Sequence, residues 1–330
     1  MYQRSQGGKT YVPLEAKGRF LGGSNTPKFS KMVSWKYSHM SARLVCEDLE
    51  MNHSRPLSTK LVQSVSAHVE DVAMEKEFEW EYDLPEFDQV VNFISVGRDG
   101  TTTAIRGEGY RETMCGTISF YGSDGGRMHT IYSACAPEYG KKTFDSVLGM
   151  EIERVKAMFP AVKYTGLADG AKDNWNYLSQ YVQVEILDFY HATEYLTKAS
   201  AVLKKGEQAQ QQWANNACQD LKHKKNGARF IVRELKCWLK ENGDGPQETI
   251  SKTITYFENN LERMNYPAYQ KMGYTIGSGV TEAACKTVVK QRLSQSGMRW
   301  NLGNAQGMLV TRALVATDGR WEQFWKYYMR

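Results

Sequence analysis

The segment from Val90 to Tyr190 constrains the fold most, because it alternates strand-like and helix-like patterns. Three strand-like runs are followed by an amphipathic helix, a strand, a short helix and a last strand. Apolar runs rich in Val, Ile, Tyr and Phe are typical of strands, whereas apolar residues three and four apart are typical of helices. This order predicts a mixed α/β sheet. The expected strands are Val90–Asp99, two runs within Glu112–Ala136 joined by a hairpin turn at Ser123–Gly126, Ala161–Asp169 and Val182–Tyr190, and the expected helices are Phe144–Phe159 and Asn174–Tyr181.

Both flanks of this segment have helical patterns. Residues 1–30 are rich in Gly, Ser and Lys and are expected to form an extended arm or a small ribbon, after which Lys31–Met51 has helical spacing. A second helix follows, with Ser58 and Thr59 as its expected caps. Two helices joined by a short loop suit a helix-turn-helix-like module. After His191 the chain has helical spacing to about Tyr269, and a further helix follows with Ser278 as its expected cap.

Charge is unevenly distributed along the chain, whose formal net charge is +5. Residues 70–88 contain nine acidic residues and one Lys. Residues 196–240 contain ten Lys or Arg against three acidic residues, and residues 281–330 contain eight against three. Two basic surfaces of this kind could face phosphates, although solvated helix faces have the same composition.

The six cysteines and the hydropathy bear on the cellular compartment. No two cysteines form a Cys-x2-Cys pair, so the sequence encodes no zinc ribbon, and free thiols are expected in a reducing cytosol. No apolar run approaches the ~20 residues that a membrane-spanning helix needs. The sequence therefore predicts a soluble, intracellular protein that is not bound to a membrane.

Three acidic residues occupy positions that suit the carboxylates of a phosphoryl-transfer site. Asp99 ends the first expected strand, Asp169 ends the fourth, and Glu282 opens the helix after the helical stretch. Two-metal catalysis needs carboxylates that converge on two ions, and Mg²⁺ prefers carboxylate oxygens. Each acid also has a simpler interpretation. The two Asp-Gly pairs suit turns, and Glu282 suits a first-turn acid paired with Lys286.

Taken together, these residues carry a family pattern. The stretches concerned are DG at 99–100, ADGA at 168–171, LDFYHATEYL at 187–196, GSGVTEAACKTVVKQRL at 277–293 and SGMRW at 296–300. They closely resemble the bacterial insertion-sequence transposases of the Kra type, which are relatives of the Mutator-like DDE transposases. The resemblance runs from about Tyr11 to the C-terminus and is most specific from Gly277 to Trp300. Asp169 follows Asp99 by 70 residues and Glu282 follows Asp169 by 113, which leaves room for the family's helical insertion.

The resemblance implies the roles of the site residues. Asp99, Asp169 and Glu282 would be catalytic ligands of two Mg²⁺ ions, for which Mn²⁺ can substitute. The Asp188–His191 stretch resembles a Cys/Asp-x2-His signature of Mutator relatives. His191 would contact the scissile phosphate or orient a ligand, with Asp188 behind it; alternatively, His191 only opens a helix and bonds to Asp188.

The DNA contacts are expected from basic residues of the insertion and the tail. Trp300 is expected either to stack on an unpaired base or to pack under the core. The residues expected to contact DNA are Lys204, Lys205, Lys222, Lys224, Lys225, Lys286, Lys290, Arg292, Arg299 and Trp300.

The sequence therefore predicts an α/β protein with a ribonuclease-H-like mixed sheet, although periodicity alone also allows other α/β sheets. Its expected parts are an N-terminal arm and helical DNA-binding region (1–88), the first part of the catalytic core (89–191), an all-α insertion (192–270), and the Glu-bearing helix with C-terminal helices (271–330). Relatives carry paired cysteines in an upstream zinc ribbon, and this sequence begins at about the place where that ribbon would end.

The expected function is DNA transposition by Mg²⁺-dependent cleavage and strand transfer at insertion-sequence ends. The expected partners are terminal inverted repeats, target DNA and further copies of the chain, in a dimer or higher oligomer on DNA in the bacterial cytoplasm and nucleoid. Two alternatives stay open: a structure-directed nuclease of the junction-resolvase type, and a non-catalytic DNA-binding regulator, which would not need all three acids.

Overall fold

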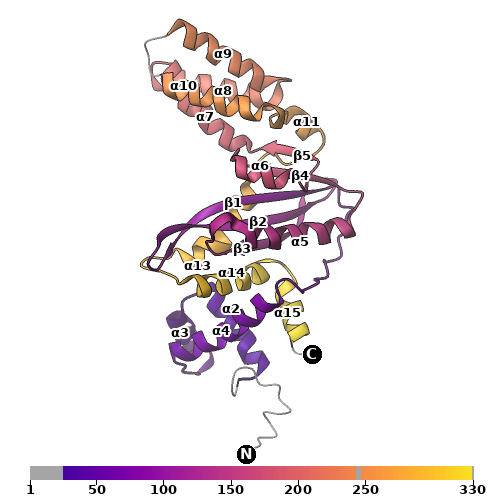
Figure 1. Cartoon of the computed structure of the whole chain (residues 1–330), viewed down its shortest axis with the longest axis vertical. Coiled ribbons are helices and arrows are strands. Elements are labelled where there is room, and N and C mark those ends of the chain that lie inside the picture. The colour runs from indigo at the N-terminus through magenta and orange to yellow at the C-terminus, as the bar shows by residue number, and fades with distance from the viewer. Residues whose placement is uncertain (1–24, 243–246, 329–330) are drawn as a thin grey trace, which may run out of the picture.

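The computed structural model describes residues 25–242 and 247–328, which form a long, layered molecule (Figure 1). A helical bundle lies at one end, the β-sheet lies in the middle, and the N- and C-terminal helices pack together at the other end. Most of the arm expected over residues 1–30 lies outside the described residues, and its last part begins helix α2, which starts at Pro27.

The expected mixed α/β sheet is confirmed. Its strand order is β3-β2-β1-β4-β5, in which β1, β2 and β3 are antiparallel neighbours and β4 and β5 run parallel to β1. The hairpin predicted at Ser123–Gly126 joins β2 to β3, and Gly125 supplies the positive φ of +77° that this turn needs. The strands are β1 (Phe93–Ile105), β2 (Gly109–Tyr121), β3 (Arg127–Cys135), β4 (Lys163–Ala168) and β5 (Val184–Leu187).

Strand β1 is longer than the sequence predicts, and the expectation that it ends at Asp99 was wrong. Asp99 pairs with Cys115 of β2, and β1 continues beside β2 to Ile105. Parallel pairing with β4, however, stops at Gly97 and Leu167. The chain stays extended past this point because β2 still satisfies its backbone hydrogen bonds. Asp99 therefore lies inside β1, two residues after the last residue of β1 that pairs with β4.

Helices cover both faces of the sheet. Helix α5 (Lys142–Met158), predicted from its apolar spacing, and the short α6 (Lys172–Leu178) pack with Met114 on one face. Cys115 packs on the other face with helix α12 (Gly279–Ala284) and the π-helical segment η3 (Cys285–Lys290). Successive strand residues point to opposite faces, so these two neighbours mark the two layers. The chain ends in α13 (Gln291–Leu293), α14 (Leu302–Ala316) and α15 (Arg320–Tyr328).

The N-terminal region contains three described helices where the sequence predicts two. The helix expected over Lys31–Met51 is broken, because the Ser41 side chain accepts a hydrogen bond from the Leu44 N–H and begins a new helix. Ser58 caps the last of the three through the Leu61 N–H, as predicted. The first and the last of these helices pack against α14, and the last also packs against α15 (Figure 1). They are α2 (Pro27–His39), α3 (Ala42–His53) and α4 (Thr59–Lys76).

The stretch after β5 is helical, as predicted, and forms the bundle at the far end of the molecule (Figure 1). Strand β5 ends earlier than expected, because the Asp188 side chain accepts the His191 N–H and opens a helix at Phe189. One expected break lies at Lys224–Asn226, and the other falls mainly on residues 243–246, outside the described part. The bundle comprises α7 (Phe189–Leu203), α8 (Glu207–His223), α9 (Gly227–Glu241), α10 (Gln247–Asn260), η2 (Leu261–Arg263) and α11 (Tyr266–Lys271).

Candidate active site

Three aspartates lie in a row where the parallel strands of the sheet end. The β1–β4 register stops at Gly97 and Leu167, two residues before Asp99 and Asp169 respectively. The β4–β5 register stops at Ala168 and Leu187, each followed directly by an aspartate, Asp169 or Asp188. Because the carboxyl ends of parallel strands meet at one edge of a sheet, Asp99, Asp169 and Asp188 lie side by side there.

Asp99 carries a carboxylate held between two layers. One oxygen accepts the Gly100 N–H at 2.7 Å, and the other lies 3.7 Å from Cys285 Sγ, which donates to it. Burial raises the pKa of the Asp99 carboxyl, the Gly100 N–H lowers it, and the charges of Asp169 and Glu282 raise it further. Two carboxylates from distant parts of the chain therefore act electrostatically on Asp99.

Asp169 combines a turn with a free carboxylate oxygen. Its Oδ1 accepts the Ala171 N–H at 3.0 Å and Asn174 Nδ2 at 3.1 Å, while Gly170 takes a φ of +100°. The turn interpretation is therefore correct for Oδ1. In the described residues no hydrogen bond involves Oδ2. This second oxygen is available to a ligand, so the turn does not exclude metal binding.

Arg98 holds Asp169 in place through Asn174, and the sequence analysis did not predict this role. Its guanidinium is buried and donates to Asn174 Oδ1 at 2.8 Å, so Asn174 bridges Arg98 to Asp169. Arg98 also pairs with Asp145 and Asp173, both at 2.9 Å. The periodicity of an apolar strand does not indicate what a charged residue within it contacts. The only available signal was that a buried arginine needs acidic partners.

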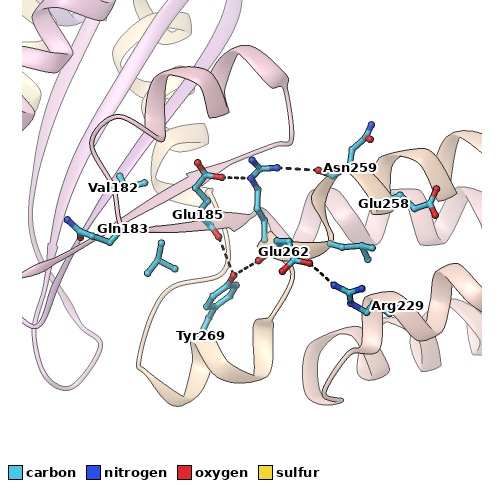
Figure 2. Close-up of a pocket in the computed structure, with 11 residues that line it drawn as sticks. Val182, Gln183, Glu185, Arg229, Glu258, Asn259, Glu262 and Tyr269 are labelled. Carbon is cyan, nitrogen blue, oxygen red and sulfur yellow. Dashed lines mark hydrogen bonds and ion pairs between the residues drawn. The ribbon is translucent and has the colours of Figure 1, made fainter.

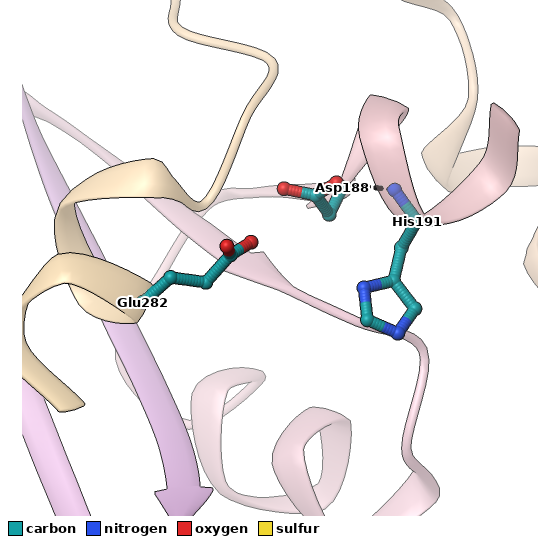
Figure 3. A group of neighbouring side chains, drawn as sticks. All are labelled: Asp188, His191 and Glu282. Atoms are coloured by element: carbon teal, nitrogen blue, oxygen red, sulfur yellow. Dashed lines mark hydrogen bonds between the residues drawn. The ribbon is translucent and has the colours of Figure 1, made fainter. Parts of the chain in front are cut away.

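Asp188, His191 and Glu282 form a cluster that could hold a metal ion (Figure 3). One ligand atom of each lies within 4.8 Å of the others, and among the described residues this is the one group of three His, Cys, Asp or Glu with that property. We expected Asp188 only to support His191. Asp188 also lies close to Glu282, because its second oxygen accepts the N–H of Ser278, the residue just before α12.

The Glu282 side chain is positioned by contacts of the two residues Ser278 and Thr281 at the start of its helix. Ser278 stands at the N-cap position of α12, as predicted, but its side chain makes no capping hydrogen bond and its Oγ instead donates to Glu282 Oε1 at 2.8 Å. Thr281 bonds Thr117 of β2 at 2.8 Å. A Cβ on Gly97 would lie 1.9 Å from Thr281 Oγ1, so only glycine lets α12 approach β1 this closely.

The negative charge of this edge is not neutralised by nearby cations. Across residues 25–242 and 247–328, no ion pair involves Asp99, Asp169, Asp188 or Glu282, and the pair expected between Glu282 and Lys286 is not formed. Unpaired carboxylates gathered at rigid strand ends are the donor set that hard divalent cations prefer. The residues present therefore fit a divalent metal.

The basic candidates of the insertion fall into two separate groups. Lys204 and Lys205 are exposed between α7 and α8, whereas Lys224 and Lys225 follow the other end of α8. Helix α8 has 17 residues, which corresponds to ~26 Å. Lys222 is half-buried, with its Nζ 5.7 Å from the centre of the Phe189 ring, so the second group lies near the acidic edge.

The tail candidates differ in exposure. Lys286, Lys290 and Arg299 are exposed, in agreement with phosphate contacts. Arg292 is only 2% exposed, and its Nε donates to the Tyr37 carbonyl at 3.0 Å, so its expected role as a surface phosphate contact was wrong. Trp300 is half-buried beside it, 4.9 Å from the Arg292 guanidinium.

A cavity of about 580 Å³ between β5 and the insertion is distinct from the acidic edge (Figure 2). Its charged groups are paired with one another: Arg263 with Glu185 at 2.5 Å, and Arg229 with Glu262 at 2.6 Å. The Tyr269 hydroxyl donates to the carbonyls of Glu185 and Glu262, both at 3.2 Å. These contacts attach the insertion to the edge strand β5 and leave few polar groups free to bind a ligand.

Comparison with known proteins adds no family assignment: no family model matches the chain, and no curated protein matches it. None of the helices in the described residues combines the length and hydropathy needed to cross a lipid bilayer.

Proposed function

We propose that this chain is a DDE-type DNA transposase, with a ribonuclease-H-like core that cleaves DNA at the ends of an insertion sequence and joins the 3′-hydroxyls to target DNA. The sheet order β3-β2-β1-β4-β5, with β2 antiparallel, supports this fold assignment because it is the order of ribonuclease-H-like sheets. The resemblance of the motifs around Asp99, Asp169 and Glu282 supports the reaction class.

One observation carries the proposal: Asp99 and Asp169 occupy matching positions at the sheet edge that Asp188 also joins, and Glu282 reaches this edge with a ligand atom within 4.8 Å of one on Asp188. Asp99, Asp169 and Glu282 are the proposed ligands of two Mg²⁺ ions, with Asp188 and His191 beside Glu282. When bound, the two ions would stabilise the charges on the attacking and leaving oxygens of an in-line displacement. A third carboxylate that reaches this edge from a separate helix is better explained by metal binding than by turn formation.

The remaining residues of the site orient these ligands. Asn174 and the Ala171 N–H fix one oxygen of Asp169, which leaves the other without a hydrogen bond among the described residues. Ser278 fixes one oxygen of Glu282. His191 is held at the start of α7 by the Asp188 carboxylate, where its imidazole would contact the scissile phosphate. Ligands locked in this way keep their geometry during the reaction.

The test is a comparison of DNA substrates with the purified chain in Mg²⁺. The substrates are duplexes carrying the DNA ends of the element that encodes the chain, four-way junctions, and duplexes of unrelated sequence. We expect nicking at the element ends and joining of the new 3′ ends to a target plasmid, and we expect Glu282→Gln to abolish both. The control is Glu262→Gln, whose side chain lies in the separate cavity.

Two outcomes would contradict the proposal. Preferential cutting of four-way junctions would identify a structure-directed nuclease. Tight binding of the element ends without any cleavage, in Mg²⁺ or Mn²⁺, would identify a regulator.

A further inference from the structure

A second polar cavity, of about 340 Å³, lies where the N-terminal helices meet the C-terminal layer. Its walls include Arg106 from the end of β1, Arg292 and Trp300 from the segment after η3, and Gln63 from α4. The volume falls within the usual range for small-ligand sites, about 300–1,000 Å³. This cavity is separate from the acidic edge and from the cavity beside β5.

The cavity is strongly cationic. Three arginines line it, Arg106, Arg292 and Arg299, and no Asp or Glu does. Arg106 and Arg299 are exposed, and no ion pair in the described part of the chain involves any of the three. The exposed guanidinium groups of Arg106 and Arg299 therefore favour phosphate, which they can bind through two parallel hydrogen bonds.

Trp300 gives the cavity an aromatic wall with an unsatisfied donor. The Arg292 guanidinium lies between two rings, 4.7 Å from the centre of Tyr37 and 4.9 Å from that of Trp300. This cation fixes the indole in place. Trp300 Nε1 is buried and has no hydrogen-bond partner among the described residues. The ring packs against the core cluster that contains Cys285 and Leu309, and because it is only half-buried it also lines the cationic cavity, where it can stack on a nucleobase.

The N-terminus of α14 opens on the same cavity. Asn301 caps this helix by accepting the Asn304 N–H at 2.8 Å, and both residues line the cavity. The first turn of a helix carries partial positive charge and free N–H groups, which adds to the preference for an anion. Amide side chains at the rim also match the hydrogen-bonding edges of bases.

The distance to the acidic edge suits a continuous DNA strand. Trp300 is joined to the end of β1, since the Arg106 N–H donates to the Trp300 carbonyl at 2.8 Å. Asp99 precedes Ile105, the strand partner of Trp300, by six residues, or ~20 Å. At ~3.4 Å per nucleotide this length corresponds to about six nucleotides. The exposed Lys286 and Lys290 lie on the helical segment that connects Glu282 to this region.

We infer that this cavity binds one unpaired nucleotide of the cleaved DNA, about six nucleotides from the scissile bond, with its base against Trp300 and its phosphate against Arg106 and Arg299. The position relative to the scissile bond rests on the proposed function, whereas nucleotide binding itself does not. An unpaired base at this distance would fix the register of the strand in the acidic site.

The first test needs no cleavage. Binding of a fluorescein-labelled 12-nucleotide oligothymidylate to the full chain is measured by anisotropy in EDTA over a range of salt. Arg106→Gln/Arg299→Gln should flatten the log–log salt slope by up to about 1.4, at ~0.7 per contact on a single strand. Trp300→Leu should weaken binding about 5- to 150-fold, and Trp300→Phe should largely restore it.

The control is Arg127→Gln/Lys163→Gln, two exposed cations away from the cavity, which should bind like the wild type. Both substituted arginines, Arg106 and Arg299, are exposed, so the double variant should fold, and circular dichroism checks this. An unchanged salt slope in the arginine variant, or equal binding by the Phe and Leu variants, would overturn the inference.

The second test locates the nucleotide. Single mismatches are placed two to ten nucleotides from the cleaved bond of an element-end duplex, and binding is compared. A mismatch lowers the cost of unpairing, so it should strengthen binding most near position six, and Trp300→Leu should remove this gain. An equal effect at every position would overturn the inference.

The two proposals fail in different ways. If the chain cleaves no DNA but the first test succeeds, the cavity binds nucleotides and the transposase proposal is wrong. If the chain cleaves element ends but the cavity variants bind as the wild type does, the cavity inference is wrong.

Discussion

Asp169 and Asp124 make the same local hydrogen bond, because each carboxylate accepts the backbone N–H two residues later, at 3.0 Å and 2.8 Å. They differ in surroundings. Asp124 lies in an exposed hairpin, whereas Asp169 lies beside Asp99 at the end of the parallel strands. The same substitution at Asp124 and at Asp169 therefore distinguishes a turn residue from a metal ligand.

We expect Asp169→Asn to fold and to bind DNA at least as tightly as the wild type, since Asn serves such turns and a charge that repels phosphate is removed. Cleavage should fall by about a thousandfold or more, because misplacing a metal forfeits several kcal/mol of transition-state stabilisation at ~1.36 kcal/mol per decade. Single-turnover cleavage rates measure this. Asp124→Asn should cleave normally, and equal rates for the two variants would leave Asp169 as a turn residue only.

Glu70 provides a prediction about stability at a single residue. It is buried on α4, where Gly307 of α14 leaves room for it: a Cβ at that glycine would lie 2.8 Å from the Glu70 Cβ. Burial raises the pKa of Glu70 from 4.5 to about 7, although Arg292 lowers it in part. The folded chain thus binds a proton that the unfolded chain releases. The stabilising contribution is full below pH 4.5 and is lost as the pH rises through about 7.

Glu70→Gln, which stays neutral, should therefore be more stable than the wild type at pH 8, by about 2–3 kcal/mol, and nearly equal to it at pH 5. Urea denaturation at the two pH values measures the difference. Glu75→Gln, an exposed position on the same helix, should change stability by less than ~0.5 kcal/mol at either pH. The account of Glu70 is wrong if the Gln variant differs from the wild type equally at pH 5 and pH 8.

At the scale of elements, helix α8 divides the basic residues of the insertion. Lys224 and Lys225 follow the end of α8 near Phe189, where α7 begins, and Lys204 and Lys205 precede its other end. Lys224 also pairs with Asp220 at 2.7 Å, an exposed contact that phosphate can replace. DNA in the acidic site should therefore contact the first pair more than the second.

Lys224→Gln/Lys225→Gln should flatten the salt dependence of element-end binding by up to about 1.8 in log–log slope, at ~0.9 per duplex phosphate contact. Lys204→Gln/Lys205→Gln carries the same charge change and should have a smaller effect. Fluorescence anisotropy at several salt concentrations measures both slopes. If neither slope changes, the insertion presents only solvated lysines.

The elements that the sequence predicted were those with a clear local signal. The strand runs, the hairpin at Ser123–Gly126 and the Ser58 cap were predicted because each depends on neighbouring residues. The break at Ser41 was missed because helical spacing continues across it. The end of β5 was missed because apolar residues continue on both sides of Asp188 and no Gly or Pro separates the strand from the helix.

At the scale of the whole molecule, contacts between distant segments were beyond sequence reasoning. Ser278 bonds Asp188, 90 residues earlier, and this contact brings Glu282 to Asp188 and His191. The bridge between Ile105 and Trp300 likewise joins two of the four separate segments that line the arginine-lined cavity. The family resemblance named Asp99, Asp169 and Glu282, but it did not show that Arg98 and Asn174 support Asp169.

The central claim for the whole molecule is that carboxylates from three parts of the chain hold divalent metal at one sheet edge. The most direct measurement is Mn²⁺ binding to the purified full chain, read by electron paramagnetic resonance without DNA. We expect saturable binding by the wild type and by Asp124→Asn, and strongly weakened binding by Asp169→Asn and Glu282→Gln with folding retained. Wild-type Mn²⁺ binding in both of these variants, or no saturable binding by the wild type, would contradict the account.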